Sequence, residues 1–275
     1  MKRKQHIHRC TVALLLLVAG GCAPGQDGRF PPPTINALFP PSMFGVAVYE
    51  DVTFTTSQGH IVHGWFMPVE NSQGTVLINH GAVSNRSGLF GHYTLLMQLG
   101  YNVFVYDYQG FGESYTQPSL DTILPDANAA LAYLQQRTDP GTDRIVLYGV
   151  SLGTLPTIAQ AVESPDNVVG IVLEGSFVPE FLPPWSMLLI GIAPWANAIA
   201  NLPAELEPRQ HVRDITLPKM FIQSQADTVT PFSGAELLFE LAAEPKQFVE
   251  TSGLHAAAWQ DVPAFPDTLG AFLSS

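Results

Sequence analysis

Short, continuous runs of hydrophobic residues recur along the chain from residue 51 onward. Uninterrupted runs of this length are typical of strands that are buried on both faces of a sheet. Two earlier segments instead alternate hydrophobic and polar positions on either side of Ser-Gln-Gly at 57–59, which predicts an antiparallel hairpin. The predicted strands cover 52–56, 60–67, 75–79, 102–106, 144–148, 168–173, 219–223 and 247–250.

The segments between these strands carry hydrophobic residues at helical spacing. They predict helices over 89–99, 125–136, 152–162, 233–243 and 263–273. Strands that alternate with helices form a mostly parallel sheet with helices on both of its faces. We therefore expect an α/β domain, and α/β folds of up to about 250 residues are commonly single domains.

Residues 175–208 interrupt this rhythm. The interval contains two tryptophans and several prolines among many leucine, isoleucine and alanine residues. An insertion of this length inside a compact domain is typically functional, and we interpret it as a short apolar cap over a site. The alternative is an ordinary pair of surface helices that packs on the core.

The N-terminus has the pattern of a targeting segment. Basic residues lead into a hydrophobic run at 11–19, which is too short to span a bilayer but fits the hydrophobic region of a secretory signal. The run ends in Ala-Gly-Gly-Cys at 19–22, which resembles a bacterial lipoprotein signal, although Ala19 stands where that family usually has leucine. The resemblance implies that residues 1–21 are removed and that Cys22 is lipidated and becomes the first mature residue. Plain signal cleavage and an uncleaved anchor are the alternatives.

Proline and glycine are abundant over residues 22–45, which predicts an extended tether between the anchor and a folded domain at 46–275. The two cysteines are Cys10 and Cys22, so the mature domain would hold no thiol for a disulfide or a metal site. We expect an exported protein of the bacterial cell envelope, held at a membrane by its lipid anchor. The oligomeric state is not predicted.

Composition and charge exclude two broad classes. Hydrophobic residues make up 46% of the chain and charged residues 13%, so the sequence can bury a large core and is not that of a disordered protein. The formal net charge is −12, and the first 21 residues hold four basic residues and no acidic one. An acidic domain without a basic patch repels phosphate backbones, which makes nucleic acid an unsuitable partner.

A candidate nucleophile stands at the end of one predicted strand. Residues 149–153 read Gly-Val-Ser-Leu-Gly, between the strand at 144–148 and the helix at 152–162. A sharp strand-to-helix turn leaves no room for side chains two residues either side of the serine, and it lifts the serine hydroxyl out of the sheet. In this context the motif predicts that Ser151 is a nucleophile.

A serine hydroxyl needs a base, usually a histidine that is oriented by a carboxylate. His255 follows the last predicted strand, at the sheet edge where Ser151 also lies, and is the predicted base. Asp227 follows the strand at 219–223 and is the predicted acid, although an aspartate before a proline-capped turn is also ordinary turn chemistry. Glu174, at the end of the strand at 168–173, is the alternative acid.

Two backbone N–H groups should stabilise an oxyanion beside the nucleophile. We assign one to Leu152 and the other to Ala82, in the loop after the strand at 75–79, where Gly81 lets the chain approach the substrate. His80 precedes both predicted partners in the chain, and its ring is expected to brace this loop by hydrogen bonding.

These motifs occur in an order that resembles the α/β-hydrolase superfamily. They are His-Gly at 80–81, Asp-Tyr-Gln-Gly-Phe-Gly-Glu-Ser at 107–114, the Ser151 turn, Asp-Thr-Val-Thr-Pro at 227–231 and His255. The likeness is to the branch that holds small esterases, monoglyceride-lipase-like enzymes and serine aminopeptidases. It implies an eight-stranded, mostly parallel sheet, a triad of Ser151, Asp227 and His255, a covalent acyl-enzyme and no cofactor. Thr154 replaces a glycine that relatives often have, and Pro156 is expected to kink or delay the helix after Ser151.

The leading functional hypothesis is hydrolysis of a small carboxylic ester with an apolar acyl or alcohol part, because the 175–208 interval is apolar and offers few charges. A serine aminopeptidase is the alternative enzyme, with Glu205 and Glu207 as the nearby acids that could hold a peptide terminus. A catalytically silent, lipid-anchored binding protein on a hydrolase scaffold is the alternative of a different class.

Overall fold

The computed structural model describes residues 37–275 except 115, 164, 190–191, 193–194 and 261–263. The predicted signal at 1–21, Cys22 and the tether up to residue 36 lie outside the described residues. No helix within the described part of the chain is long and apolar enough to cross a membrane.

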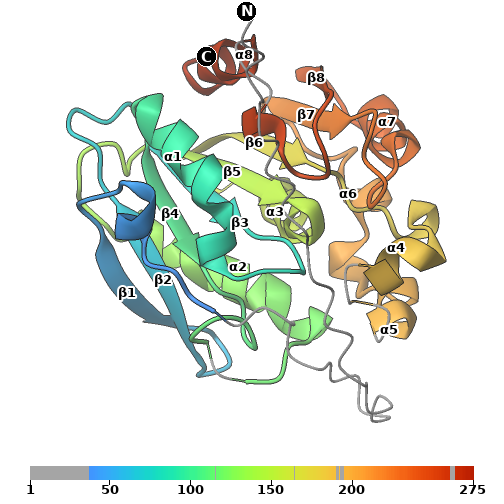
Figure 1. The fold of residues 1–275 in the computed structure, drawn as a ribbon, viewed down its shortest axis with the longest axis horizontal. Helices are drawn as coiled ribbons and strands as arrows, with labels where there is room; N and C mark the ends of the chain where they lie inside the picture. The colour runs from blue at the N-terminus through green and yellow to red at the C-terminus, as the bar shows by residue number, and fades with distance from the viewer. Residues whose placement is uncertain (1–36, 115, 164, 190–191, 193–194, 261–263) are drawn as a thin grey trace, which may run out of the picture.

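Eight strands form one sheet in the order β1-β2-β4-β3-β5-β6-β7-β8 (Figure 1). Strand β2 runs antiparallel to β1 and β4, and every other pair is parallel. The expected mostly parallel, eight-stranded sheet is therefore confirmed. The strands are β1 (Glu50–Thr55), β2 (Ile61–Met67), β3 (Thr75–Asn79), β4 (Asn102–Tyr106), β5 (Ile145–Val150), β6 (Val168–Glu174), β7 (Lys219–Ser224) and β8 (Lys246–Thr251).

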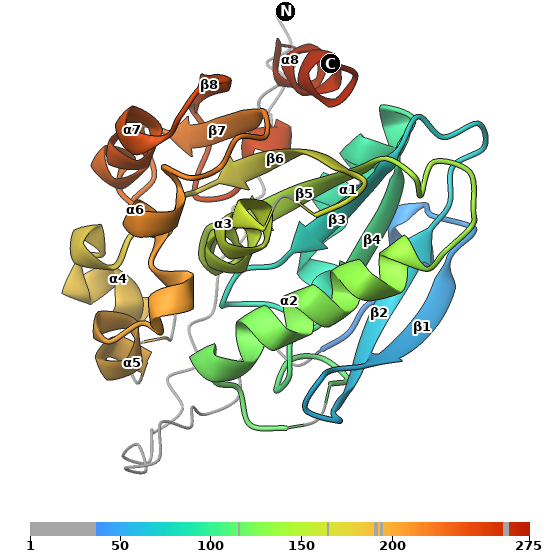
Figure 2. The same ribbon diagram turned by 180° about the vertical axis from the view of Figure 1, so that it is seen from behind.

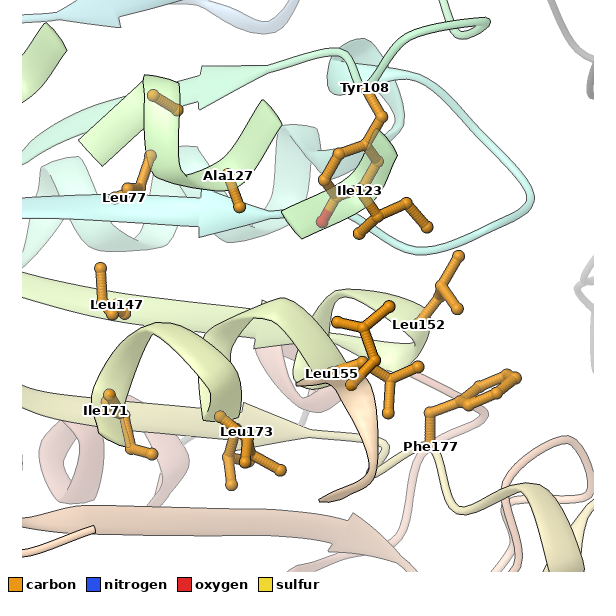
Figure 3. Close-up of a cluster of buried hydrophobic side chains, with 14 of the residues drawn as sticks. Leu77, Tyr108, Ile123, Ala127, Leu147, Leu152, Leu155, Ile171, Leu173 and Phe177 are labelled. Carbon is orange, nitrogen blue, oxygen red and sulfur yellow. The ribbon is translucent and has the colours of Figure 1, made fainter. Parts of the chain in front are cut away.

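Helices cover both faces of the sheet (Figure 2). Helices α2 (Leu120–Gln135), α3 (Thr154–Val162) and α7 (Phe232–Leu241) share a core with one face, whereas α1 (Phe90–Gln98) and α8 (Ala264–Leu273) share a core with the other. Leu77 of β3 lies in the first core, while its neighbours Val76 and Ile78 lie in the second. Figure 3 shows the first core, where Leu77 and Leu147 of adjacent strands lie among side chains of α2 and α3. Burial on both faces explains why the strands have continuous hydrophobic sequences.

Two helices begin differently from the sequence expectation. The start of α2 is Leu120 rather than residue 125, because the Ser119 side chain caps the helix by accepting from the Asp121 N–H, and Pro125 lies inside the helix. The segment after Ser151 starts as a 3-10 turn, η3 (Ser151–Gly153), and becomes helical at Thr154. Pro156 therefore falls in the first turn of α3, where a missing N–H costs no intrahelical bond.

The interval 175–208 contains short helices between β6 and β7, with η4 (Pro179–Phe181), α4 (Pro184–Leu189), α5 (Ala196–Ala200) and η6 (Ala204–Leu206). Helices α4 and α5 lie together at one end of the molecule (Figures 1 and 2). Trp195 is buried against Phe111, with ring centroids 6.1 Å apart, whereas Trp185 and Leu188 of α4 are exposed. The segment thus combines contact with the main body and an apolar outer surface.

The last residues that the sequence assigned to the tether belong to the folded body. The 3-10 helix η1 (Pro41–Phe44) packs against α1, where the Phe44 ring stacks on that of Phe90 with centroids 4.6 Å apart. Proline is frequent in a tether, but it also suits the first turn of a helix, as at Pro41.

A buried carboxylate in α2 gives a testable stability effect. Asp126 is fully buried and accepts hydrogen bonds from the backbone N–H and the Nε2 of Gln109, both at 2.7 Å. Burial raises the pKa of Asp126 to about 7, although the bonds from Gln109 lower it. When a group has a higher pKa in the folded protein than in the unfolded chain, the protein loses stability as the pH rises between the two pKa values. For Asp126 this range runs from its unfolded pKa, near 4, to its folded pKa, about 7.

We expect Asp126→Asn to match the wild type in stability near pH 4 and to exceed it by up to about 4 kcal/mol at pH 8. The amide keeps the shape of the side chain and carries no charge that must be buried. Urea unfolding at both pH values measures the difference, with the exposed Asp143→Asn as the control. An equal free energy of unfolding for wild type and Asp126→Asn at pH 8 would contradict this account.

Candidate active site

Ser151 stands at a strained turn between β5 and α3. Its φ is 54°, in the left-handed region that few non-glycine residues adopt. Space around the turn is short, because a Cβ on Gly149 would lie 2.7 Å from the Gly153 carbonyl oxygen and one on Gly153 would lie 2.0 Å from that of Asn79. Only glycine fits at either position, as the motif predicts.

Three loops at the carboxyl edge of the sheet bring the predicted triad residues together. The Nε2 of His255 lies 2.9 Å from the Ser151 Oγ, and its Nδ1 lies 2.7 Å from the Asp227 Oδ2. The three residues follow β5, β7 and β8, whose carboxyl ends point to one side because these strands are parallel. With the proton on Nδ1 donated to Asp227, Nε2 is free to accept from the serine hydroxyl.

Asp227 is fixed by more bonds than the one to His255. Its Oδ1 accepts from the backbone N–H groups of Val229 and Thr230 at 2.8 and 2.9 Å. Its Oδ2 also accepts from the Thr230 hydroxyl at 2.9 Å and from the Gln223 Nε2 at 3.1 Å. Burial raises the pKa of Asp227, but the bond to His255, the histidine charge and the two backbone N–H groups together lower it below its ordinary value. Asp227 is therefore a carboxylate at neutral pH.

Gln223 and Thr230 were assigned no role from the sequence. Gln223 also donates to the Thr230 carbonyl and accepts from the Ser176 N–H, so it links the loop after β7 to the loop after β6. The sequence signal for Gln223 is its place at the end of a buried strand, because a buried side-chain amide needs several hydrogen-bond partners.

Glu174, the alternative acid, forms hydrogen bonds with other groups than His255. Its carboxylate accepts from the His92 Nε2 at 2.9 Å, the Tyr148 hydroxyl at 2.7 Å and the Ala258 N–H at 2.9 Å. Burial raises the pKa of Glu174, but the His92 charge and these hydrogen bonds lower it overall. The carboxylate that meets His255 is that of Asp227.

The loop after β3 lies against the nucleophile. A Cβ on Gly81 would be 3.2 Å from that of Ser151, so a larger residue would crowd the turn. The buried His80 accepts the Tyr108 N–H at its Nε2 and contacts the Gly81 carbonyl through Nδ1 at 2.7 Å, which braces the loop as expected. Burial lowers the pKa of His80, which keeps the ring neutral and suits an accepting Nε2.

The predicted oxyanion donors lie on the two sides of this contact. Ala82 follows Gly81 and is buried, and Leu152 is in the turn that opens α3, where backbone N–H groups lack intrahelical acceptors. Their role as donors to an oxyanion stays a prediction. Within the described residues, no group of three or more His, Cys, Asp or Glu side chains is arranged to hold a metal ion.

Comparison with known proteins places these features in context. Residues 70–212 match the family described as serine aminopeptidase, S33. The uncharacterised protein YfhR of Salmonella typhimurium is 30% identical over 233 residues, 78% of this chain and 77% of its own length. The α/β-hydrolase domain-containing protein WAV2 of Arabidopsis thaliana is 31% identical over 229 residues, 77% of this chain and 74% of its own.

Solved structures share the fold at lower identity. The Pyrococcus furiosus esterase Pf2001 superposes with a TM-score of 0.74 at 21% identity, over 90% of this chain and 98% of the esterase. An esterase from Exiguobacterium antarcticum has a TM-score of 0.64 at 16% identity, over 82% of this chain and all of its own. At these identities the likeness establishes the fold.

Proposed function

The chain belongs to the serine aminopeptidase S33 family of α/β hydrolases, and from this premise we propose that it is a serine hydrolase that cleaves carboxylic esters with an apolar acyl or alcohol part. The observation that carries the proposal is the hydrogen-bonded line from Ser151 through His255 to Asp227. Such a line is what a serine needs to act as a nucleophile near neutral pH.

In the proposed acylation step, the Ser151 oxygen bonds to the ester carbonyl carbon while His255 takes the hydroxyl proton at Nε2. The carbonyl oxygen becomes an oxyanion that the N–H groups of Ala82 and Leu152 stabilise. The bond between the carbonyl carbon and the alcohol oxygen then breaks, and the departing alcohol takes the proton from His255. Asp227 stabilises the positively charged imidazole between these transfers.

Water completes the proposed cycle. His255 takes a proton from a water molecule, whose oxygen bonds to the acyl carbon, and the bond from that carbon to Ser151 breaks as the serine regains its proton. The products are a carboxylic acid, an alcohol and the free enzyme. No cofactor or metal enters this balance.

The charges near the cap favour an ester over a peptide terminus. Glu180 and Glu207 both bind Arg209, at 2.5 and 3.2 Å, so neither is an unpaired carboxylate for a substrate amine. Glu205 lines a surface hollow with Leu120 and Leu124 of α2. The remaining cap is rich in apolar side chains, which suits an uncharged ester.

Two assays test this proposal. A fluorophosphonate probe should phosphonylate Ser151 with loss of fluoride, and the Ser151→Ala variant should remain unlabelled. Activity on p-nitrophenyl esters of several acyl lengths is expected to exceed activity on aminoacyl anilides. Higher activity on the anilides than on the esters would indicate a peptidase. An absence of both labelling and turnover would favour the hypothesis of a catalytically silent binding protein.

A glycine beside His255 gives a sharper test of the geometry. Gly175 has a φ of 63°, and a Cβ there would lie 3.1 Å from the His255 Cε1 and 3.3 Å from its Nδ1. We expect Gly175→Ala to displace the imidazole slightly and to lower kcat/KM, by less than the roughly 10²-fold loss that a misplacement of about 1 Å causes.

Gly59→Ala is the matched control for this substitution. Gly59 also has a left-handed φ, 82°, but a Cβ there has nothing within 4 Å. The backbone strain is comparable, so any further loss of stability or activity in Gly175→Ala reports the crowding of His255. Equal activity in the two variants would contradict the assigned place of His255.

We further propose that the chain is exported and anchored through lipid on Cys22, as its N-terminal pattern suggests. Mass spectrometry of the mature N-terminus should find a lipidated Cys22, and Cys22→Ala should move the protein out of the membrane fraction. An unmodified Cys22 in membrane-bound protein would overturn the proposal.

A further inference from the structure

A buried carboxylate outside the proposed triad binds the chain just after His255. Glu174, at the end of β6, is 2% exposed. His92 of α1 and Tyr148 of β5 both donate to its Oε2, while the backbone N–H of Ala258 donates to its Oε1. The Glu174 side chain therefore joins the sheet, the helix α1 and the segment that follows His255.

Ala258 is three residues after the proposed base, and the chain between them turns sharply. Ala256 has a φ of 51°, a conformation that the surrounding structure must hold in place. Trp259, which follows Ala258, packs so closely on α1 that a Cβ on Gly91 would lie 2.2 Å from its ring. This part of the loop is fixed by Glu174 and Trp259.

The other side of the loop has its own attachment. The Ser224 hydroxyl, at the end of β7, donates to the Gly253 carbonyl two residues before His255. His255 thus lies between two fixed points, and the Glu174 contact is the one with a charged acceptor. Hydrogen bonds to an ionised acceptor are about twice as strong as those between neutral groups.

We propose that Glu174 is a positioning residue for His255, which it holds in reach of Ser151 by binding the Ala258 N–H. The inference rests on the proposed function, because it gives Glu174 a role in placing the base of that reaction. The His92 side chain keeps the Glu174 carboxylate charged and oriented, so these two residues work as a supporting pair. Neither touches the substrate in this account.

The chemistry of the cluster selects a substitution that acts on the loop. Three donors face Glu174, two of them at Oε2. Glu174→Gln replaces the charged acceptor of the Ala258 N–H in either orientation of the new amide. If the amide nitrogen faces Ala258, a donor meets a donor; if it faces His92 and Tyr148, which can both accept, the Ala258 N–H keeps only a weaker, neutral acceptor.

We expect Glu174→Gln to lower kcat about tenfold with little change in KM, and to slow fluorophosphonate labelling by the same factor. Hydrogen–deuterium exchange should rise in the peptide that covers residues 252–258. A purely structural loss would lower the melting temperature without changing kcat in the folded enzyme.

Tyr148→Phe is the matched control. It removes a hydrogen bond from the same buried carboxylate but leaves the Ala258 contact intact. We expect it to lower the melting temperature and to label at the wild-type rate. Slowing as large as that of Glu174→Gln would overturn the inference.

If Glu174→Gln does not fold, Ala258→Pro tests the positioning role instead, because proline has no N–H to donate to Glu174. Proline is tolerated there, because Ala258 is the first residue of a 3-10 helix. Ala258→Gly, which keeps the N–H, is its control. Wild-type labelling rates in Glu174→Gln, or in Ala258→Pro where that variant is decisive, would overturn the positioning role but leave the proposed hydrolase intact. An unlabelled wild type would instead overturn the proposed function and the inference with it.

Discussion

The His255→Ala variant is expected to hydrolyse p-nitrophenyl esters on the order of 10⁶-fold more slowly than the wild type, as measured by kcat. Without the imidazole, 2.9 Å from the Ser151 Oγ in the structure, the hydroxyl has no base to take its proton. Ser151→Ala should lose a similar factor, and the double variant should lose little more, because the two residues act as one unit. Stopped and continuous assays at high enzyme concentration cover this range.

His60→Ala controls for the loss of a histidine. His60 is exposed on the β1–β2 turn, and β4 and β3 lie between β2 and the strand β5 that leads to Ser151, so removal of His60 should leave kcat unchanged. Fluorophosphonate labelling should follow the same order, fast in the wild type and in His60→Ala and very slow in His255→Ala. Turnover by His255→Ala within tenfold of the wild type would show that another group activates the serine.

The strands were the most predictable part of this fold. The segments 75–79 and 102–106 match β3 and β4 at both ends, because strands buried on both faces need hydrophobic residues at every position. Helix ends were harder to place, because they depend on single capping contacts such as that of Ser119. Pro125 is the stronger sequence signal for the start of a helix, yet α2 begins after Ser119.

That Ser151, His255 and Asp227 lie together could be predicted because chain order and strand ends limit the choices. Parallel strands place their carboxyl ends at one edge, so a serine, an aspartate and a histidine after three such strands were expected at the same edge. The groups that hold them could not be predicted in the same way. Gln223 and Thr230 reach Asp227 through side-chain conformations and loop paths that no spacing rule describes.

The structure identifies Asp227, not Glu174, as the carboxylate that contacts His255, and its substitution should greatly lower kcat. Asp227→Asn is expected to lower kcat about 10⁴-fold. The amide oxygen will stay with the two backbone N–H groups that bind Oδ1, so the amide nitrogen replaces Oδ2 and donates toward His255. His255 must then carry its proton on Nε2, facing Ser151, where it cannot accept another.

The comparison of Asp227→Asn with Glu174→Gln separates the two carboxylates by mechanism. The first variant changes which nitrogen of His255 holds the proton, whereas the second loosens the loop around an imidazole that keeps its partner. The expected losses in kcat therefore differ, about 10⁴-fold against about tenfold, and Asp214→Asn, at an exposed position, should show none. Should the order reverse, with Glu174→Gln the more damaging, the carboxylate that serves His255 during turnover would be the one after β6, and the loop would have to move to reach it.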